Sequence, residues 1–102
     1  MNYDIIIAKC LVLKTYRELD IYLNEIFKDY TFVEDADVLN GLKKRIWESI
    51  DENNLGDEVT NFVGFNNEEG DAEFGFARRL QMPEDVYAGM LHWVHCRLEQ
   101  FG

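Results

Sequence analysis

Apolar residues recur at spacings of three and four along most of this chain. This period constrains the fold more than any other feature, because it places side chains on one face of an α-helix. The clearest case is the last segment, where Pro83 suits a first helical turn and Glu84 and Asp85 follow at the positive end of the helix dipole. We expect a buried stripe on this helix at Val86, Tyr87, Met90, Leu91, Val94, Leu98 and Phe101.

The first segment shows the same period, at Ile5, Ala8, Val12, Tyr16, Leu19, Leu23, Ile26 and Tyr30. Residues 5–13 are apolar nearly all round, so we expect them to be buried on most sides, and a buried strand is the alternative there. Thr15 and Glu18 match the capping box that begins a helix. The segment is therefore predicted to be one long helix, or two with a joint near Lys14.

A third helix is predicted after Asp35 or Asp37, either of which is a suitable N-cap. Its apolar stripe is Val38, Leu39, Leu42, Ile46, Trp47 and Ile50. Gly41 within it costs about 1 kcal/mol relative to alanine. The polar residues 51–56 end it, with Gly56 expected in a turn or a left-handed conformation.

Residues 58–65 and 73–80 are short, aromatic and β-branched, and they flank the polar stretch 66–71. This pattern predicts a β-hairpin, although a short helix over 57–63 is the alternative for its first half. The predicted fold class is therefore α+β, mainly helical, with three or four helices packed against one small antiparallel β-hairpin. At 102 residues, we expect a single globular domain over 1–102.

Acidic residues outnumber basic ones by twenty to ten, and the net charge is −10. Residues 46–77 hold nine acids and no base, together with five aromatic residues. This charge argues against nucleic acid or anionic membrane as direct partners and favours a basic protein partner. The predicted partner-binding residues are Glu48, Asp51, Glu52, Asp57, Glu58, Glu68, Glu69, Asp71, Glu73 and Phe65. The alternative is a solvated acidic face over a phenylalanine core.

No motif specifies a reaction, so we expect no enzyme activity and no cofactor. His92, His95 and Cys96 have spacings at which helix neighbours could share a metal, but no second Cys/His cluster exists to complete a site. Residues 51–56 resemble the start of a calcium loop, but Leu55 and Phe62 occupy two ligand positions. No metal site is predicted.

The two cysteines, Cys10 and Cys96, are expected to be reduced core thiols, because two cysteines do not make a disulfide framework.

The N-terminal residues lack the features of a targeting segment, and no apolar run approaches the roughly 18 residues that span a bilayer. We therefore expect a cytoplasmic protein. A small acidic protein of this kind suits an inhibitor, such as the immunity protein or antitoxin of a basic nuclease toxin. The alternatives are a nucleic-acid mimic that inhibits a DNA-binding or defence complex, and a structural adaptor with no inhibitory role. The sequence does not specify the oligomeric state.

Overall fold

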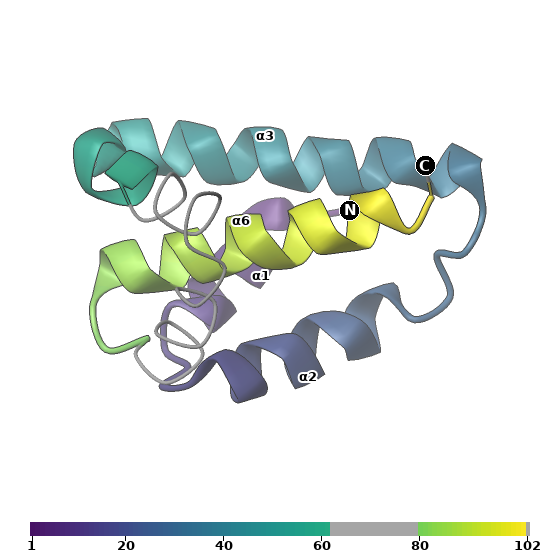
Figure 1. Ribbon diagram of the computed structural model, residues 1–102, viewed down its shortest axis with the longest axis horizontal. Helices are drawn as coiled ribbons and strands as arrows, with labels where there is room; N and C mark the ends of the chain where they lie inside the picture. Colours follow the sequence, from purple (N-terminus) through teal and green to yellow (C-terminus); the bar gives the residue numbers. More distant parts are fainter. Residues whose placement is uncertain (62–79, 102) are drawn as a thin grey trace.

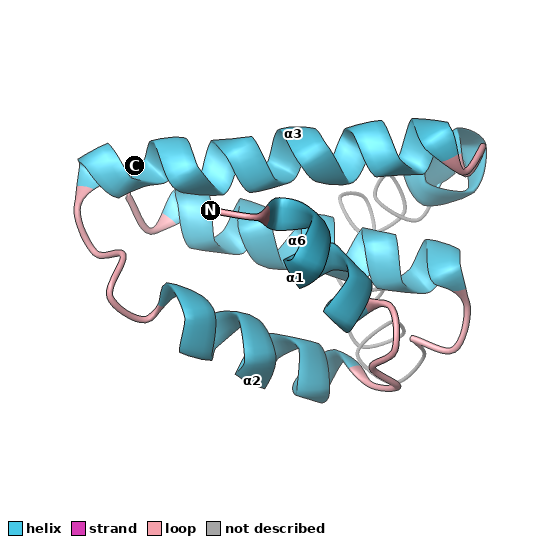
Figure 2. Cartoon of the chain, turned by 180° about the vertical axis from the view of Figure 1, so that it is seen from behind, coloured by secondary structure: helices cyan, strands magenta, loops and turns pink. Residues whose placement is uncertain are grey.

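The computed structural model describes residues 1–61 and 80–101, and they form helices and their connections. The helices are α1 (Tyr3–Cys10), α2 (Tyr16–Phe27), the 3₁₀ turn η1 (Val33–Asp35), α3 (Ala36–Glu52) and α6 (Pro83–Glu99). Residues 56–61 are also helical. Helix α6 runs between α3 and α2, and α1 crosses behind it (Figures 1 and 2). Within the described ranges, no helix has the length and apolar character needed to cross a membrane.

The predicted β-hairpin is wrong. Residues 58–61, the described part of its first strand, are helical, and no strand occurs in residues 1–61 or 80–101. The remainder of the hairpin prediction lies outside the described residues. Val59 is fully buried while Glu58 and Thr60 are exposed, a pattern that both a strand and an amphipathic helix satisfy over so short a stretch. The helical alternative holds over the residues that the structure describes.

The first segment forms two helices, joined by residues 11–15. Thr15 caps α2, because its Oγ1 accepts a hydrogen bond from the Glu18 amide at 3.1 Å. The Glu18 carboxylate accepts one from the Lys14 amide, also at 3.1 Å. The predicted cap at Thr15 is therefore confirmed, whereas Glu18 binds the amide of Lys14 and not that of Thr15, as a capping box would require. The cap at Thr15 selects the two-helix alternative.

The predicted burial in α1 is wrong. Ile5, Ala8 and Val12 are exposed, whereas Ile6, Ile7 and Cys10 are buried. A single stripe cannot continue through the joint, because the non-helical residues between α1 and α2 break its phase. In α2 the stripe holds, with Leu19 and Leu23 fully buried.

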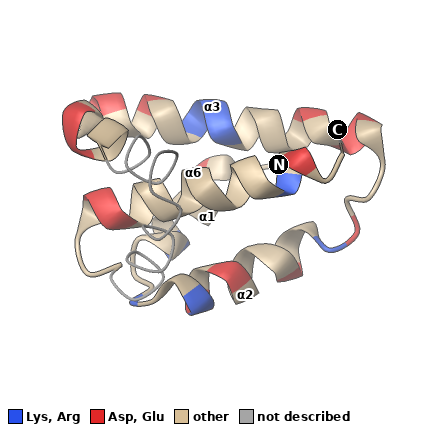
Figure 3. Cartoon of the chain, in the orientation of Figure 1, with Lys and Arg blue, Asp and Glu red and all other residues tan. Residues whose placement is uncertain are grey.

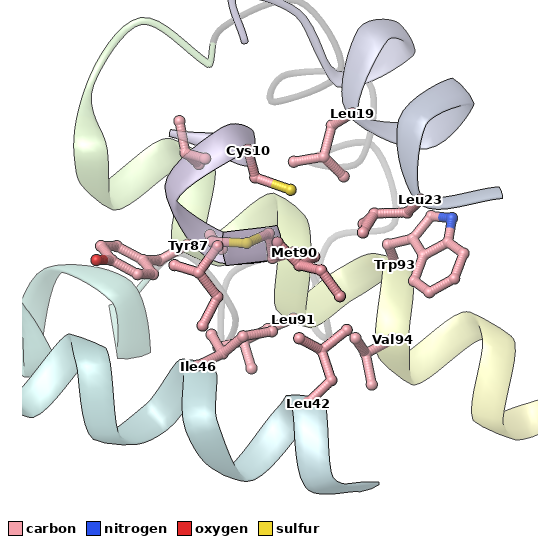
Figure 4. Close-up of a cluster of buried hydrophobic side chains, with 14 of the residues drawn as sticks. Cys10, Leu19, Leu23, Leu42, Ile46, Tyr87, Met90, Leu91, Trp93 and Val94 are labelled. Atoms are coloured by element: carbon pink, nitrogen blue, oxygen red, sulfur yellow. The ribbon is translucent and has the colours of Figure 1, made fainter. Parts of the chain in front are cut away.

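Helix α6 is the centre of the core, and all ten residues of 85–94 except His92 are buried. Its neighbours supply facing apolar side chains (Figure 4), with Leu42 and Ile46 of α3 on one side and Leu19 and Leu23 of α2 on the other. Since α6 is buried on nearly all sides, it has little difference in polarity between its faces. Every residue of the stripe predicted for it is nevertheless buried or half-buried.

Asp35 is the N-cap residue of α3, one of the two that the sequence predicted, but its side chain does not cap this helix. The Asp35 carboxylate instead accepts hydrogen bonds from the amides of Thr31 and Phe32, at 3.1 and 3.2 Å, and so closes the 3₁₀ turn. At the other end the left-handed residue is Asn54, with φ of 58°, and not Gly56. The Leu55 amide reaches the Ile50 carbonyl at 3.0 Å, as in a Schellman motif, in which asparagine can replace glycine.

Gly41 allows α1 to pack closely on α3. A Cβ at this position would lie 2.5 Å from the Tyr3 Oη and 3.0 Å from its Cζ. The Tyr3 hydroxyl donates a hydrogen bond to the Val38 carbonyl at 2.9 Å. The glycine is therefore required for this contact, although it weakens the helix itself.

This packing predicts that the effect of Gly41→Ala depends on Tyr3. In the native protein the substitution should lower the free energy of unfolding by about 1 kcal/mol, because it displaces the ring and breaks a hydrogen bond. In a Tyr3→Ala background it should instead raise stability by about 1 kcal/mol, through helix propensity. Urea denaturation of the four proteins in this double-mutant cycle measures the coupling. Equal effects in both backgrounds would contradict the packing argument.

Candidate partner-binding surface

Five of the predicted partner-binding residues lie in the part of the chain that the structure describes. Glu48, Asp51 and Glu52 occupy the last turns of α3, and Asp57 and Glu58 begin the helical stretch 56–61. All five are exposed. They gather at one end of the molecule, on the left in Figure 3. The other five, Phe65, Glu68, Glu69, Asp71 and Glu73, lie outside the described residues.

Arg45 neutralises part of this charge, although it lies just before the base-free segment. Its guanidinium forms ion pairs with Glu52 at 3.2 Å and with Glu48 at 3.8 Å, and it also pairs with Asp4 of α1. The hydrogen bonds to Glu52 and then Asp4 raise the pKa of Arg45 above its ordinary value. Glu48 and Glu52 are therefore partly compensated. Asp51, Asp57 and Glu58 form no ion pair with another described residue.

Glu84 adds a carboxylate that the sequence analysis did not assign to the surface. It lies in the first turn of α6, and that turn reaches the same end of the molecule as the last turn of α3 (Figure 3). Its neighbour Asp85 is only 3% exposed and does not contribute. We call Asp51, Asp57, Glu58 and Glu84 the acidic end. The signal for Glu84 was present, since an acid after Pro83 marks a helix start, but its position beside α3 depends on the fold.

Three helix termini lie at the acidic end, and the helix dipole stabilises a carboxylate at two of them and destabilises it at the third. Asp57, Glu58 and Glu84 lie in first turns, where the positive end of the helix dipole favours them. Asp51 lies in the last turn of α3, where the dipole favours cations, and α3 has no basic residue there. Helix stability therefore accounts for three of these carboxylates and disfavours the fourth.

The histidine and cysteine side chains of α6 point to different neighbours among the described residues. The Cys96 Sγ lies 3.6 Å from the His92 Nε2, whereas His95 points to Glu99, with 3.1 Å between the Nε2 and Oε1 atoms. In residues 1–61 and 80–101, no group of three or more His, Cys, Asp and Glu side chains could hold a metal ion. The Cys10 thiol is buried, as expected, and Cys96 is half-buried; both are reduced.

An apolar groove of about 660 Å³ lies between the α1–α2 joint and the start of α6. Leu11, Val12 and Leu13 line one side and Met82, Pro83 and Val86 the other. Among the described residues that line it, Lys14 is the one that carries a charge, and this charge is opposite to that of the acidic end.

Comparison of the chain with protein-family models, with curated proteins and with solved structures finds no match in any of the three. The function is therefore argued from the residues and their arrangement alone.

Proposed function

We propose that this protein binds a basic partner protein in the cytoplasm through its acidic end and neutralises it, as an immunity protein or antitoxin neutralises a nuclease toxin. The observation that supports the proposal is the convergence of carboxylates from three helix termini (Figure 3). Asp51, Asp57 and Glu58 are exposed, and the half-buried Glu84 joins them from a helix far along the chain. Like charges gathered in one place repel one another and weaken the fold. A solubilising surplus does not require such a gathering.

Electrostatics supplies the mechanism. Nuclease active sites are cationic because they hold phosphates, and carboxylates can occupy the phosphate positions while they exclude the substrate. The field of the acidic end also accelerates the encounter, since complementary charge can raise association rates by about 10–10³. The carboxylates of the acidic end lie close together on three neighbouring helix termini (Figure 3). A nucleic-acid mimic instead needs carboxylates repeated at regular steps along an extended surface. The acidic end therefore favours an inhibitor of a protein active site.

Asp51 should lower the free energy of unfolding, because its carboxylate lies at the negative end of the α3 dipole. A residue that destabilises the fold in this way is expected where it contributes to binding. We expect Asp51→Asn to raise the free energy of unfolding by about 0.3–1 kcal/mol, because it removes a negative charge from the C-terminal turn of α3. Asp37→Asn is the matched control: Asp37 is in the first turn of the same helix, so the same substitution there should lower stability by a similar amount. Thermal unfolding at low salt measures both. Changes of the same sign in the two variants would contradict the argument.

Capture of the partner from an extract of the native host tests the proposal. The wild-type chain is compared with a variant whose acidic end is neutralised (Asp51→Asn, Asp57→Asn, Glu58→Gln, Glu84→Gln). The matched control neutralises four exposed acids at the opposite end of the molecule (Glu25→Gln, Asp29→Asn, Glu34→Gln, Asp37→Asn). A basic protein should be retained by the wild type and the control and lost from the first variant. Its nuclease activity should fall to background at one equivalent of the wild-type chain. Capture of no basic protein, or undiminished nuclease activity, would count against the proposal.

A further inference from the structure

The Cys96 thiol and the His92 imidazole form a pair at the surface of α6. The Sγ lies 3.6 Å from the Nε2, and both side chains are half-buried. The Tyr16 ring of α2 packs against the imidazole, with the ring centroids 5.7 Å apart. An imidazole at this distance can accept the thiol proton and so generate the thiolate, which is the nucleophilic form of cysteine.

Cys96, but not His92, lines a polar cavity of about 170 Å³ between α2 and α6, with room for about six water molecules at about 30 Å³ each. Its lining comprises Tyr16, Asp20, Asn24, Trp93, Cys96, Arg97 and Gln100. The carboxylate of Asp20 and the guanidinium of Arg97 thus lie in the same lining as the Cys96 sulfur. A small group that bears both an ammonium and a carboxylate matches this lining.

Arg97 is fixed in the wall of this cavity. Its Nη2 donates hydrogen bonds to the carbonyls of Phe27 and Tyr30, each at 2.9 Å. Its Nε is buried and has no hydrogen-bond partner among the described residues. The Nε is closed off from the cavity, so a ligand meets the delocalised charge of the guanidinium and not this atom. That positive charge attracts the carboxylate of a zwitterion in the cavity.

We propose that Cys96 is a modification site, at which the thiol forms a mixed disulfide with a small zwitterionic disulfide of the cystine type. His92 removes the thiol proton, and the Cys96 sulfur attacks one sulfur of the disulfide. A new S–S bond forms as the old one breaks, and the departing thiolate takes up the proton held by His92. Cys96 is oxidised, and the released half of the disulfide is reduced to a thiol.

Cys10 supplies an internal comparison. Its side chain has no exposed surface, and burial raises the pKa of its thiol to about 12. Both properties suppress the thiolate and block its access to a disulfide. The two cysteines of this chain should therefore differ sharply in reactivity.

The test is incubation of the folded protein with cystine, followed by mass spectrometry of the intact chain and its peptides. The wild type should gain one cysteinyl group, on Cys96. His92→Gln should slow the reaction by about tenfold or more, since general bases commonly contribute at least that much. His95→Gln is the matched control: it makes the same change on the same helix, at an exposed residue that pairs with Glu99, and it should react at the wild-type rate.

Two further measurements distinguish the contribution of the Cys96–His92 pair to the reaction rate from that of the cavity. Uncharged hydroxyethyl disulfide should react severalfold more slowly than cystine with the wild type, and this difference should shrink in Arg97→Gln. Circular dichroism establishes that each variant is folded. Modification on Cys10, no modification of the folded chain, or equal rates for His92→Gln and His95→Gln would overturn the proposal. Equal rates with the two disulfides would overturn the assignment of a zwitterionic ligand.

Discussion

Replacement of Phe27 by alanine is expected to lower the free energy of unfolding by about 3–5 kcal/mol, the range for truncation of a buried aromatic side chain. Phe27 ends α2 and is fully buried. Its ring centroid lies 5.6 Å from that of Trp93 in α6 and 5.4 Å from that of Tyr30. A small domain has only about 5–15 kcal/mol of stability in total, so this loss removes a large part of it. Urea denaturation followed by circular dichroism measures the change.

Phe32→Ala is the matched control for this prediction. Phe32 is 69% exposed, and the same truncation there should change stability by no more than about 0.5 kcal/mol. If Phe27→Ala does not fold, Phe27→Leu should still show a loss that exceeds that of Phe32→Ala. Similar losses for Phe27→Ala and Phe32→Ala would contradict the placement of Phe27 at the centre of the α2–α6 contact.

Charge reversal at the acidic end is expected to weaken binding of the captured basic protein by about a hundredfold or more, because like charges that face each other across an interface cost several kcal/mol. The variant carries lysine at Asp51, Asp57, Glu58 and Glu84. Its control carries lysine at Glu25, Asp29, Glu34 and Asp37, which gives the same net charge and also alters acids at helix starts. Isothermal titration calorimetry measures both dissociation constants.

The control should weaken binding by less than about tenfold, through the change in long-range field alone. Equal weakening by the two variants would show that net charge, and not the acidic end, determines binding. Unchanged affinity in the acidic-end variant would place the binding surface elsewhere on the chain.

The sequence predicted what local patterns determine. The cap at Thr15, the start of the last helix at Pro83 and the buried residues of that helix follow from the apolar period and from helix-terminus preferences. The phase of α1 could not be predicted in the same way. Residues 5–13 offer apolar side chains on every face, so only the tertiary contacts decide that Ile6 and Ile7 are buried and Ile5 is exposed.

Long-range contacts account for the other differences. Gly41 appeared only as a weak point in a helix, because its role depends on Tyr3, which lies 38 positions earlier in the chain. Arg45 compensates Glu52 and Asp4 across the α1–α3 contact, which a linear charge count does not show. Glu84 joins the acidic end only because α6 begins beside the end of α3 (Figure 3). Each depends on chain segments far apart in sequence.

The salt dependence of the association rate tests the central claim most directly. Stopped-flow mixing of the wild-type chain with the captured basic protein, between about 0.05 and 0.5 M salt, should show the rate constant falling at least about tenfold as the Debye length shortens. The variant with the neutralised acidic end should associate slowly and with little salt dependence, while the control neutralised at Glu25, Asp29, Glu34 and Asp37 should follow the wild type. A rate that salt does not change, or the same rate for both neutralised variants, would contradict binding through the acidic end.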